Sequence, residues 1–147
     1  MASEIVVSDI PEFDLGLEAM MARVDVASRQ FVLRGAEEIK TEAQAQFTGN
    51  SSNAWHSDAW PIPTRWTGNL ESSIYMDNVK SLGRGVWQSE TGPHTVYGRR
   101  VELGYHGSGH WPYYTTRAFP YMEPGIKRAT PKLDKLFNDT VLAAQEA

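Results

Sequence analysis

A chain of 147 residues with a formal net charge of −4 and no cysteine suits one domain with one core, and it excludes disulfides and cysteine-ligated metals. Its composition, 41% hydrophobic and 22% charged, excludes a disordered chain, and no apolar run approaches the roughly 18 residues that a membrane-spanning helix requires. The longest basic runs are two residues, Arg99-Arg100 and Lys127-Arg128, which are too short for the basic face that DNA binding normally requires. We therefore expect a single domain, residues 1–147, without membrane attachment or specific DNA binding.

The first predicted element is a long helix over residues 11–46. Pro11 suits its first turn, and a helix of this length would measure roughly 50 Å, more than a compact domain of this size needs. Part of its apolar stripe would then pack on a neighbouring subunit. Gly35 leaves a second interpretation open, in which two helices fold back on one core. The apolar stripe recurs at intervals of three and four residues, as on one helical face: Phe13, Leu17, Met20, Val24, Ala27 and Phe31, then Ile39, Ala43 and Phe47.

Residues 48–66 are predicted to form a long aromatic loop. The segment is rich in Ser, Asn, Gly and Pro and has no periodicity. Trp55 and Trp60 lie within it, and exposed tryptophan in a loop often marks a contact surface. We expect these two residues to contact a subunit or a partner protein; packing over the domain's own core is the alternative.

Residues 67–119 are predicted to hold a small antiparallel sheet and a short helix. Residues 70–81 and 83–91 alternate loosely around Ser-Leu-Gly-Arg-Gly, which is typical of a hairpin. One or two helical turns are expected over residues 97–103. Their two faces would be Val96, Arg100 and Leu103 on one side and Tyr97 and Val101 on the other.

Residues 120–146 are predicted to be helical, with a division at Pro131, because proline removes a helix hydrogen bond and clashes with the preceding turn. The apolar stripe of its second part would be Leu133, Leu136, Phe137, Thr140 and Val141. The order of elements predicts an α+β fold: a long N-terminal helix, a small antiparallel β-sheet, a short helix and a C-terminal helix.

The span from Tyr105 to Tyr121 is the most aromatic part of the chain. Aromatic residues are enriched at the energetic centres of protein interfaces, and the glycines nearby would let the backbone approach a partner. We therefore expect this loop to dock a neighbouring protein. Its aromatic residues are Tyr105, Trp111, Tyr113, Tyr114, Phe119 and Tyr121.

The same loop raises alternatives from other classes of protein. Ser108 stands between His106 and His110 but lacks the flanking glycine spacing of a hydrolase nucleophile turn. Two histidines four residues apart share a face only on a helix, which the intervening glycines disfavour. A small hydrolase or metal-binding protein that also uses His94 is one alternative, and a carbohydrate-binding module is another. We expect no catalytic residue, metal or other cofactor.

Three segments carry short motifs in a fixed order: residues 64–74, 96–104 and 116–129. The motif residues are Thr67, Gly68 and Leu70, then Tyr97, Gly98, Val101, Glu102 and Gly104, and finally Arg117, Phe119, Pro120, Met122, Pro124 and Ile126. In this order the segments resemble a family of long-tailed bacteriophage proteins, known as neck, head–tail connector, tail-completion or minor tail proteins. The loops at 48–66 and 105–115 are longer and more aromatic than the family pattern requires, and loops usually select the partner.

The resemblance implies a non-enzymatic structural protein of the virion, located at the head–tail junction and assembled in the cytoplasm of a bacterial host. It implies a homo-oligomeric ring, six-fold or twelve-fold, that contacts other connector and tail proteins. DNA would pass through the ring without specific binding. A tail-terminator protein that caps the tail tube is the alternative within the same machinery. Residues 97–104 would help to set the subunit core, and Pro120 and Pro124 would fix the entry of the C-terminal helix.

Overall fold

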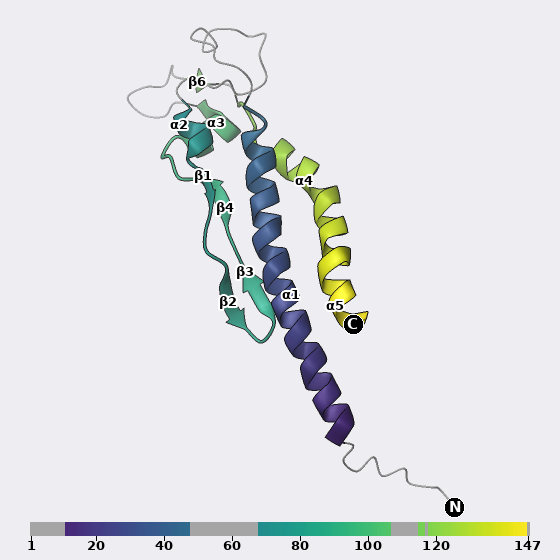
Figure 1. Ribbon diagram of the computed structural model, residues 1–147. Coiled ribbons are helices and arrows are strands. Elements are labelled where there is room, and N and C mark those ends of the chain that lie inside the picture. The colour runs from purple at the N-terminus through teal and green to yellow at the C-terminus, as the bar shows by residue number, and fades with distance from the viewer. Residues whose placement is uncertain (1–10, 48–67, 107–114, 117, 147) are drawn as a thin grey trace, which may run out of the picture.

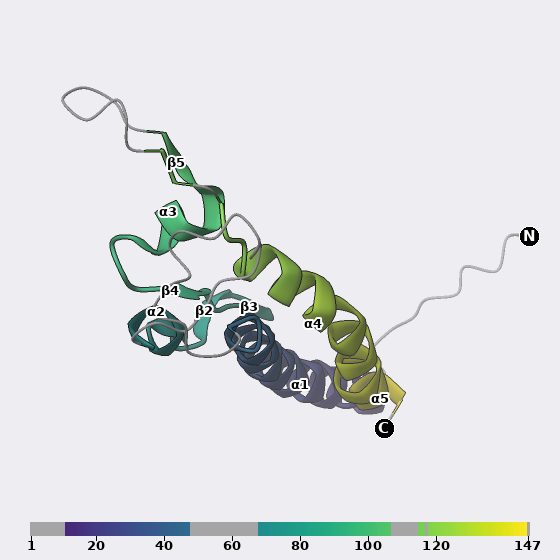
Figure 2. The same cartoon turned by 90° about the horizontal axis from the view of Figure 1, so that it is seen from above.

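The protein has an α+β fold built around one long helix. The computed structural model describes residues 11–47, 68–106, 115–116 and 118–146. Helix α1 (Pro11–Gln44) has a ribbon of strands on one side and the C-terminal helical segment on the other, as Figures 1 and 2 show. The long helix therefore contributes to two separate packing interfaces.

Helix α1 is continuous, so the interpretation as two helices folded back on one core is wrong. Gly35 is buried inside it, and a Cβ atom added there would lie 3.1 Å from Leu133 Cδ2. The glycine therefore gives room to the helix that packs against α1. The helix ends at Gln44, slightly before the expected boundary, because the Gln46 N–H turns to the carbonyl of Ala43 at 3.2 Å.

The predicted hairpin is present as a longer ribbon, and its N-terminal part is helical instead of extended. Residues Asn69–Ser72 form the single turn α2, because the Ser73 hydroxyl donates to the carbonyl of Leu70 at 2.7 Å and competes with strand pairing. Gly85, with φ 69°, makes the tight turn at the far end of the ribbon. The ribbon pairs β1 (Ile74–Met76) with β4 (Thr91–Pro93) and β2 (Lys80–Gly83) with β3 (Val86–Gln88), all antiparallel.

The expected short helix is confirmed as α3 (Gly98–Leu103). Val101 packs on the core and Val96 and Leu103 are exposed, but Tyr97, which was expected to share a face with Val101, is 44% exposed. A loop was expected to follow α3. Its two ends form an antiparallel strand pair, β5 (Tyr105–His106) with β6 (Thr115–Thr116). Threonine suits a strand because its branched side chain fits the pleated backbone.

The C-terminal segment runs antiparallel to α1 as α4 (Met122–Phe137), the π-helical stretch η2 (Asn138–Leu142) and α5 (Ala143–Glu146). The predicted division at Pro131 is wrong, because α4 continues through it. Proline removes one N–H donor, but Pro131 is exposed and the opposite face of α4, which includes the buried Ala129, packs on α1. The predicted apolar stripe is confirmed at Val141, which is buried, and at Phe137, whose ring meets that of Phe31 edge to face at 5.4 Å.

The core lies where the end of α1, the start of β1 and the start of α4 meet. The rings of Phe47 and Tyr121 lie 5.1 Å apart at its centre. Gln44 joins α1 to the other side of the core, because its side-chain amide donates to the carbonyls of Glu71 and Ile74 at 3.1 and 3.3 Å. The core residues are Ala43, Phe47, Ile74 and Tyr121, with Leu70, Val101 and Met122 packed against them.

Candidate functional site

The carboxylate of Glu102 caps the first turn of α4 from a different element. Its Oε2 atom accepts hydrogen bonds from the N–H groups of Tyr121 at 2.7 Å and Met122 at 2.9 Å, and Oε1 accepts from Glu123 at 3.0 Å. The first N–H groups of a helix have no partner within the helix, and the helix dipole favours a negative charge at this end. The carboxylate of Glu102 therefore has a capping role.

Tyr121 is fully buried, and its hydroxyl donates to the carbonyl of Gly98 at 3.1 Å. Burial raises the pKa of Tyr121 above its ordinary value, and the nearby Glu102 and Tyr97 raise it further. The hydroxyl therefore stays protonated and keeps donating. The expectation that Tyr121 belongs to a docking loop is wrong, because its ring faces Phe47 inside the core.

Many of the described motif residues lie at or beside this junction between α3 and α4, whereas Gly68 and Leu70 lie at α2 and Ile126 is exposed on α4. The Phe119 N–H donates to the carbonyl of Val101 at 2.8 Å, which draws the segment before α4 against α3. Gly68 precedes α2, and Leu70 packs on the core. Tyr97 precedes α3, and Gly104 follows its last residue. Pro120 precedes Tyr121, and Pro124 lies in the first turn of α4. These residues have structural positions, and two further motif residues, Thr67 and Arg117, lie outside the described residues.

Two glycines at the junction allow contacts that no side chain would permit. A Cβ atom on Gly125 would lie 2.7 Å from Ala43 Cα, so α4 touches the backbone of α1 there. A Cβ atom on Gly98 would lie 2.8 Å from the ring of Pro93. Real Cβ atoms do not approach so closely, so both positions require glycine in this packing.

The ribbon is held against α1 at its outer end by Trp87. Its indole N–H donates to Asp25 Oδ1 at 2.9 Å, and the Arg29 guanidinium lies 5.9 Å from the centre of its ring. Further along, the Thr91 hydroxyl donates to the carbonyl of Ala36 at 3.4 Å. Sequence reasoning missed these contacts, because the two segments are 62 residues apart at Asp25 and Trp87.

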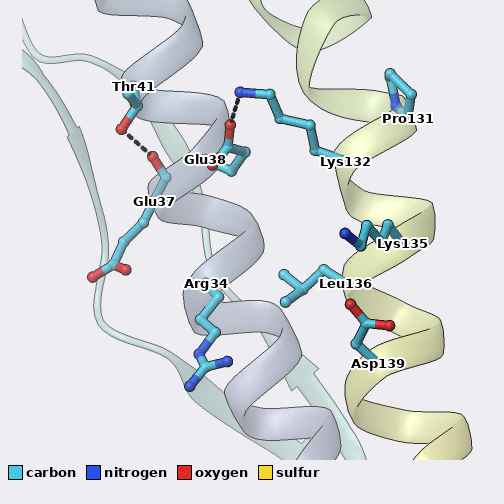
Figure 3. A pocket seen from close by; sticks show the side chains of 9 residues that line it. All are labelled: Arg34, Glu37, Glu38, Thr41, Pro131, Lys132, Lys135, Leu136 and Asp139. Atoms are coloured by element: carbon cyan, nitrogen blue, oxygen red, sulfur yellow. Dashed lines mark hydrogen bonds and ion pairs between the residues drawn. The ribbon is translucent and has the colours of Figure 1, made fainter.

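An open groove of about 710 Å³ runs between α1 and α4. Lys132 reaches across it from α4 and donates to the carboxylate of Glu38 (Figure 3). It also donates to the carboxylate of Glu42, and the two contacts raise the pKa of the lysine. Because acidic and basic groups alternate along it, the groove does not concentrate one sign of charge for a charged ligand. Its lining residues are Arg34, Glu37, Glu38, Thr41, Pro131, Lys132, Lys135, Leu136 and Asp139.

Most of the predicted contact residues lie outside the described residues. This applies to Trp55, Trp60, Trp111, Tyr113 and Tyr114, so their role stays a prediction. Tyr105 lies in β5, where its backbone pairs with Thr116.

The histidine and serine set of the alternative functions is also described only in part. Ser108 and His110 lie outside the described residues, and His94 is exposed with its ring centre 3.3 Å from that of Tyr75. Within the part of the chain that the structure describes, no three His, Asp or Glu side chains gather as a metal-binding group.

Large apolar side chains are exposed in several places, whereas only Tyr121 and Ile74 are both large and fully buried among the described residues. Scattered exposed leucines are normal, but here the N-terminal half of α1 carries several together. The exposed set is Leu15, Leu17, Met21 and Val26 on α1, Leu82 and Val86 on the ribbon, Val96 and Leu103 around α3, and Ile126, Phe137 and Leu142 in the C-terminal segment. The strongest candidate for a functional surface is therefore a protein contact surface.

Comparisons with protein-family models, with curated proteins and with solved structures find no match for this chain. Among the described helices, none combines the length and apolar character needed to cross a bilayer.

Proposed function

We propose that this chain is a structural protein of a long-tailed phage neck, which forms a ring at the head–tail junction, joins the tail to the head and lets DNA pass. The observation that carries the proposal is the apolar surface on the N-terminal half of α1. Leu15 and Met21 are 66% and 59% exposed there. Covering such side chains gains roughly 25 cal/mol per Å² of apolar area, which favours association with another protein surface.

The positions of the motif residues support the proposal. The three segments that resemble the phage family are far apart in the chain, yet Leu70, Val101 and Met122 pack against one small core. The carboxylate of Glu102, which accepts from the Tyr121 N–H, and the Phe119 N–H, which donates to the Val101 carbonyl, join α3 to the start of α4. All three segments therefore contribute to the fold of the subunit. This fits a family in which the segments form the subunit fold and the loops determine which partner is bound.

The charge of the chain fits a DNA conduit. With a net charge of −4, the subunit lacks the surplus of basic side chains that would neutralise phosphates and release counterions. DNA could pass such a ring without being held by it.

A reconstitution experiment tests the proposal. Heads and tails are prepared from a phage that encodes this chain but does not produce it, and the purified full-length chain is added. We expect joined particles in electron micrographs with the wild-type chain. We expect separate heads and tails with the folded double variant Trp111→Ala/Tyr113→Ala, which loses two aromatic residues of the predicted docking loop.

Equal circular dichroism spectra of the two chains serve as the control for folding. Joining of heads and tails without the chain, or no joining with the wild-type chain, would contradict the proposal. Caps on isolated tails, with heads left unjoined, would identify a tail terminator instead.

A further inference from the structure

One stripe along α1 binds the ribbon of the same chain. Asp25 accepts from Trp87, Arg29 lies over the Trp87 ring, and the Ala36 carbonyl accepts from Thr91. Residues three and four apart on a helix lie on one face. Continued toward the N-terminus at this spacing, the stripe gains Asp14, Glu18 and Met21. We call these residues the ribbon stripe: Asp14, Glu18, Met21, Asp25, Arg29, Val32 and Ala36.

The N-terminal part of the ribbon stripe has no ribbon on it. The hairpin turn ends beside Asp25, where a Cβ atom on Gly85 would lie 3.9 Å from Asp25 Oδ1. Figure 1 shows α1 running on past this turn and past α5. Asp14, Glu18 and Met21 are all exposed there. The same face that holds a hairpin in the middle of α1 is thus bare nearer its start.

The tip of the hairpin has the complementary chemistry on its exposed side chains. Leu82 and Val86 are 62% and 53% exposed, and Lys80 and Arg84 are exposed beside them in sequence. Among the described residues, no ion pair involves these two cations or the two acids of the bare stripe. We call Lys80, Leu82, Arg84 and Val86 the hairpin tip.

We propose that the bare part of the ribbon stripe receives the hairpin tip of a second copy of this chain. Asp14 and Glu18 would face Lys80 and Arg84, while Met21 would meet the apolar side chains of the tip. Continuity favours a hairpin on this face, because the adjoining turns already bind one through Trp87 and Thr91, and the charges of the tip favour its exposed side chains as the contact. The inference rests on the self-assembly part of the proposed function and names the two surfaces that meet.

The two surfaces are different patches of one subunit, so the contact is heterologous. Each copy offers a tip to one neighbour and a stripe to the other, which generates a closed ring when the rotation between copies closes. Direct pairing of two α1 helices would instead bring the same patch of both copies together.

Cross-linking tests the contact directly, since the chain has no cysteine of its own. One full-length chain carries Met21→Cys, and a second chain with a mass tag carries Leu82→Cys. The two are mixed and treated with a short bismaleimide. We expect a product with the combined mass of the two different chains. Ala19→Cys, exposed on another face of α1, replaces Met21→Cys as the matched control and should lose this product.

Each outcome decides the inference. A product of the two different chains with Met21→Cys, lost with Ala19→Cys, supports it. Self-linking of the Met21→Cys chain would show α1 pairing and overturn it. No link between the two chains would also overturn it. Native mass spectrometry of the wild-type chain then separates the two proposals. A ring without the cross-link would contradict the inferred contact alone, whereas a monomer would contradict both the contact and the proposed function.

A charge exchange separates the ionic contact from nonspecific collisions. Asp14→Lys/Glu18→Lys in the Met21→Cys chain should remove the cross-linked product, because like charges then meet the tip. Adding Lys80→Glu/Arg84→Glu to the Leu82→Cys chain should restore it. An unchanged yield after the first exchange, or no rescue by the second, would overturn the proposed pairing of charges. Rising salt should weaken the wild-type contact, because exposed charges are screened.

Discussion

Replacing Glu102 by alanine is expected to lower the free energy of unfolding by about 2–4 kcal/mol, because hydrogen bonds to a charged group contribute about 1.5–3 kcal/mol and the loss leaves N–H donors unpaired. The carboxylate accepts from Tyr121, Met122 and Glu123, and the first two contacts are partly buried. The Glu123 N–H is exposed and can turn to water. Urea unfolding monitored by circular dichroism measures the effect.

Glu123→Gln is the matched control for the cap. Glu123 lies in the same first turn of α4, but its side chain is exposed and accepts from Lys127 at 2.6 Å, so the substitution leaves the capped N–H groups unchanged. That pair is fully exposed, so its loss should change stability little. Equal urea midpoints for Glu102→Ala and Glu123→Gln would contradict the capping role of Glu102.

Replacing Gly125 by alanine is expected to lower the free energy of unfolding by about 1–3 kcal/mol, the usual effect of overpacking. The new methyl group would lie 2.7 Å from Ala43 Cα, and a backbone atom cannot turn away as a side chain can. This loss should exceed the gain of about 1 kcal/mol that alanine brings to a helix interior. Thermal and urea unfolding of the full-length chain measure the balance.

Gly16→Ala serves as the control, because Gly16 also lies within a helix and no atom lies within 4 Å of an added Cβ there. It should stabilise the chain by up to about 1 kcal/mol through helix propensity alone. Stabilisation by both substitutions would show that α1 and α4 are not in backbone contact at Gly125.

Periodicity was enough to predict the elements whose formation depends on nearby residues. The spacing of apolar residues identified α1 and α3, and the alternation around Gly85 identified the hairpin. The interruption expected at Pro131 did not occur, because the local loss of one hydrogen bond is outweighed by packing of α4 on α1. Packing between segments that are far apart in the chain cannot be predicted from the pattern of neighbouring residues.

The candidate site was predictable only in part for the same reason. Val101 and Leu70 were identified through the family motif and do pack on the core. The cap by Glu102 joins residues 19 positions apart, and no local pattern indicates which helix it serves. In sequence Tyr121 was one of several aromatic residues in a predicted loop, and its burial against Phe47 depends on the start of α4 beside it.

The central claim is that exposed apolar side chains on the N-terminal half of α1 are covered by other copies of this chain. Sedimentation velocity of the purified full-length chain at physiological salt, over a range of concentrations, tests it most directly. The account predicts a species whose mass is a fixed multiple of 16.5 kDa and whose share grows with concentration. A single 16.5 kDa species at every concentration would contradict it.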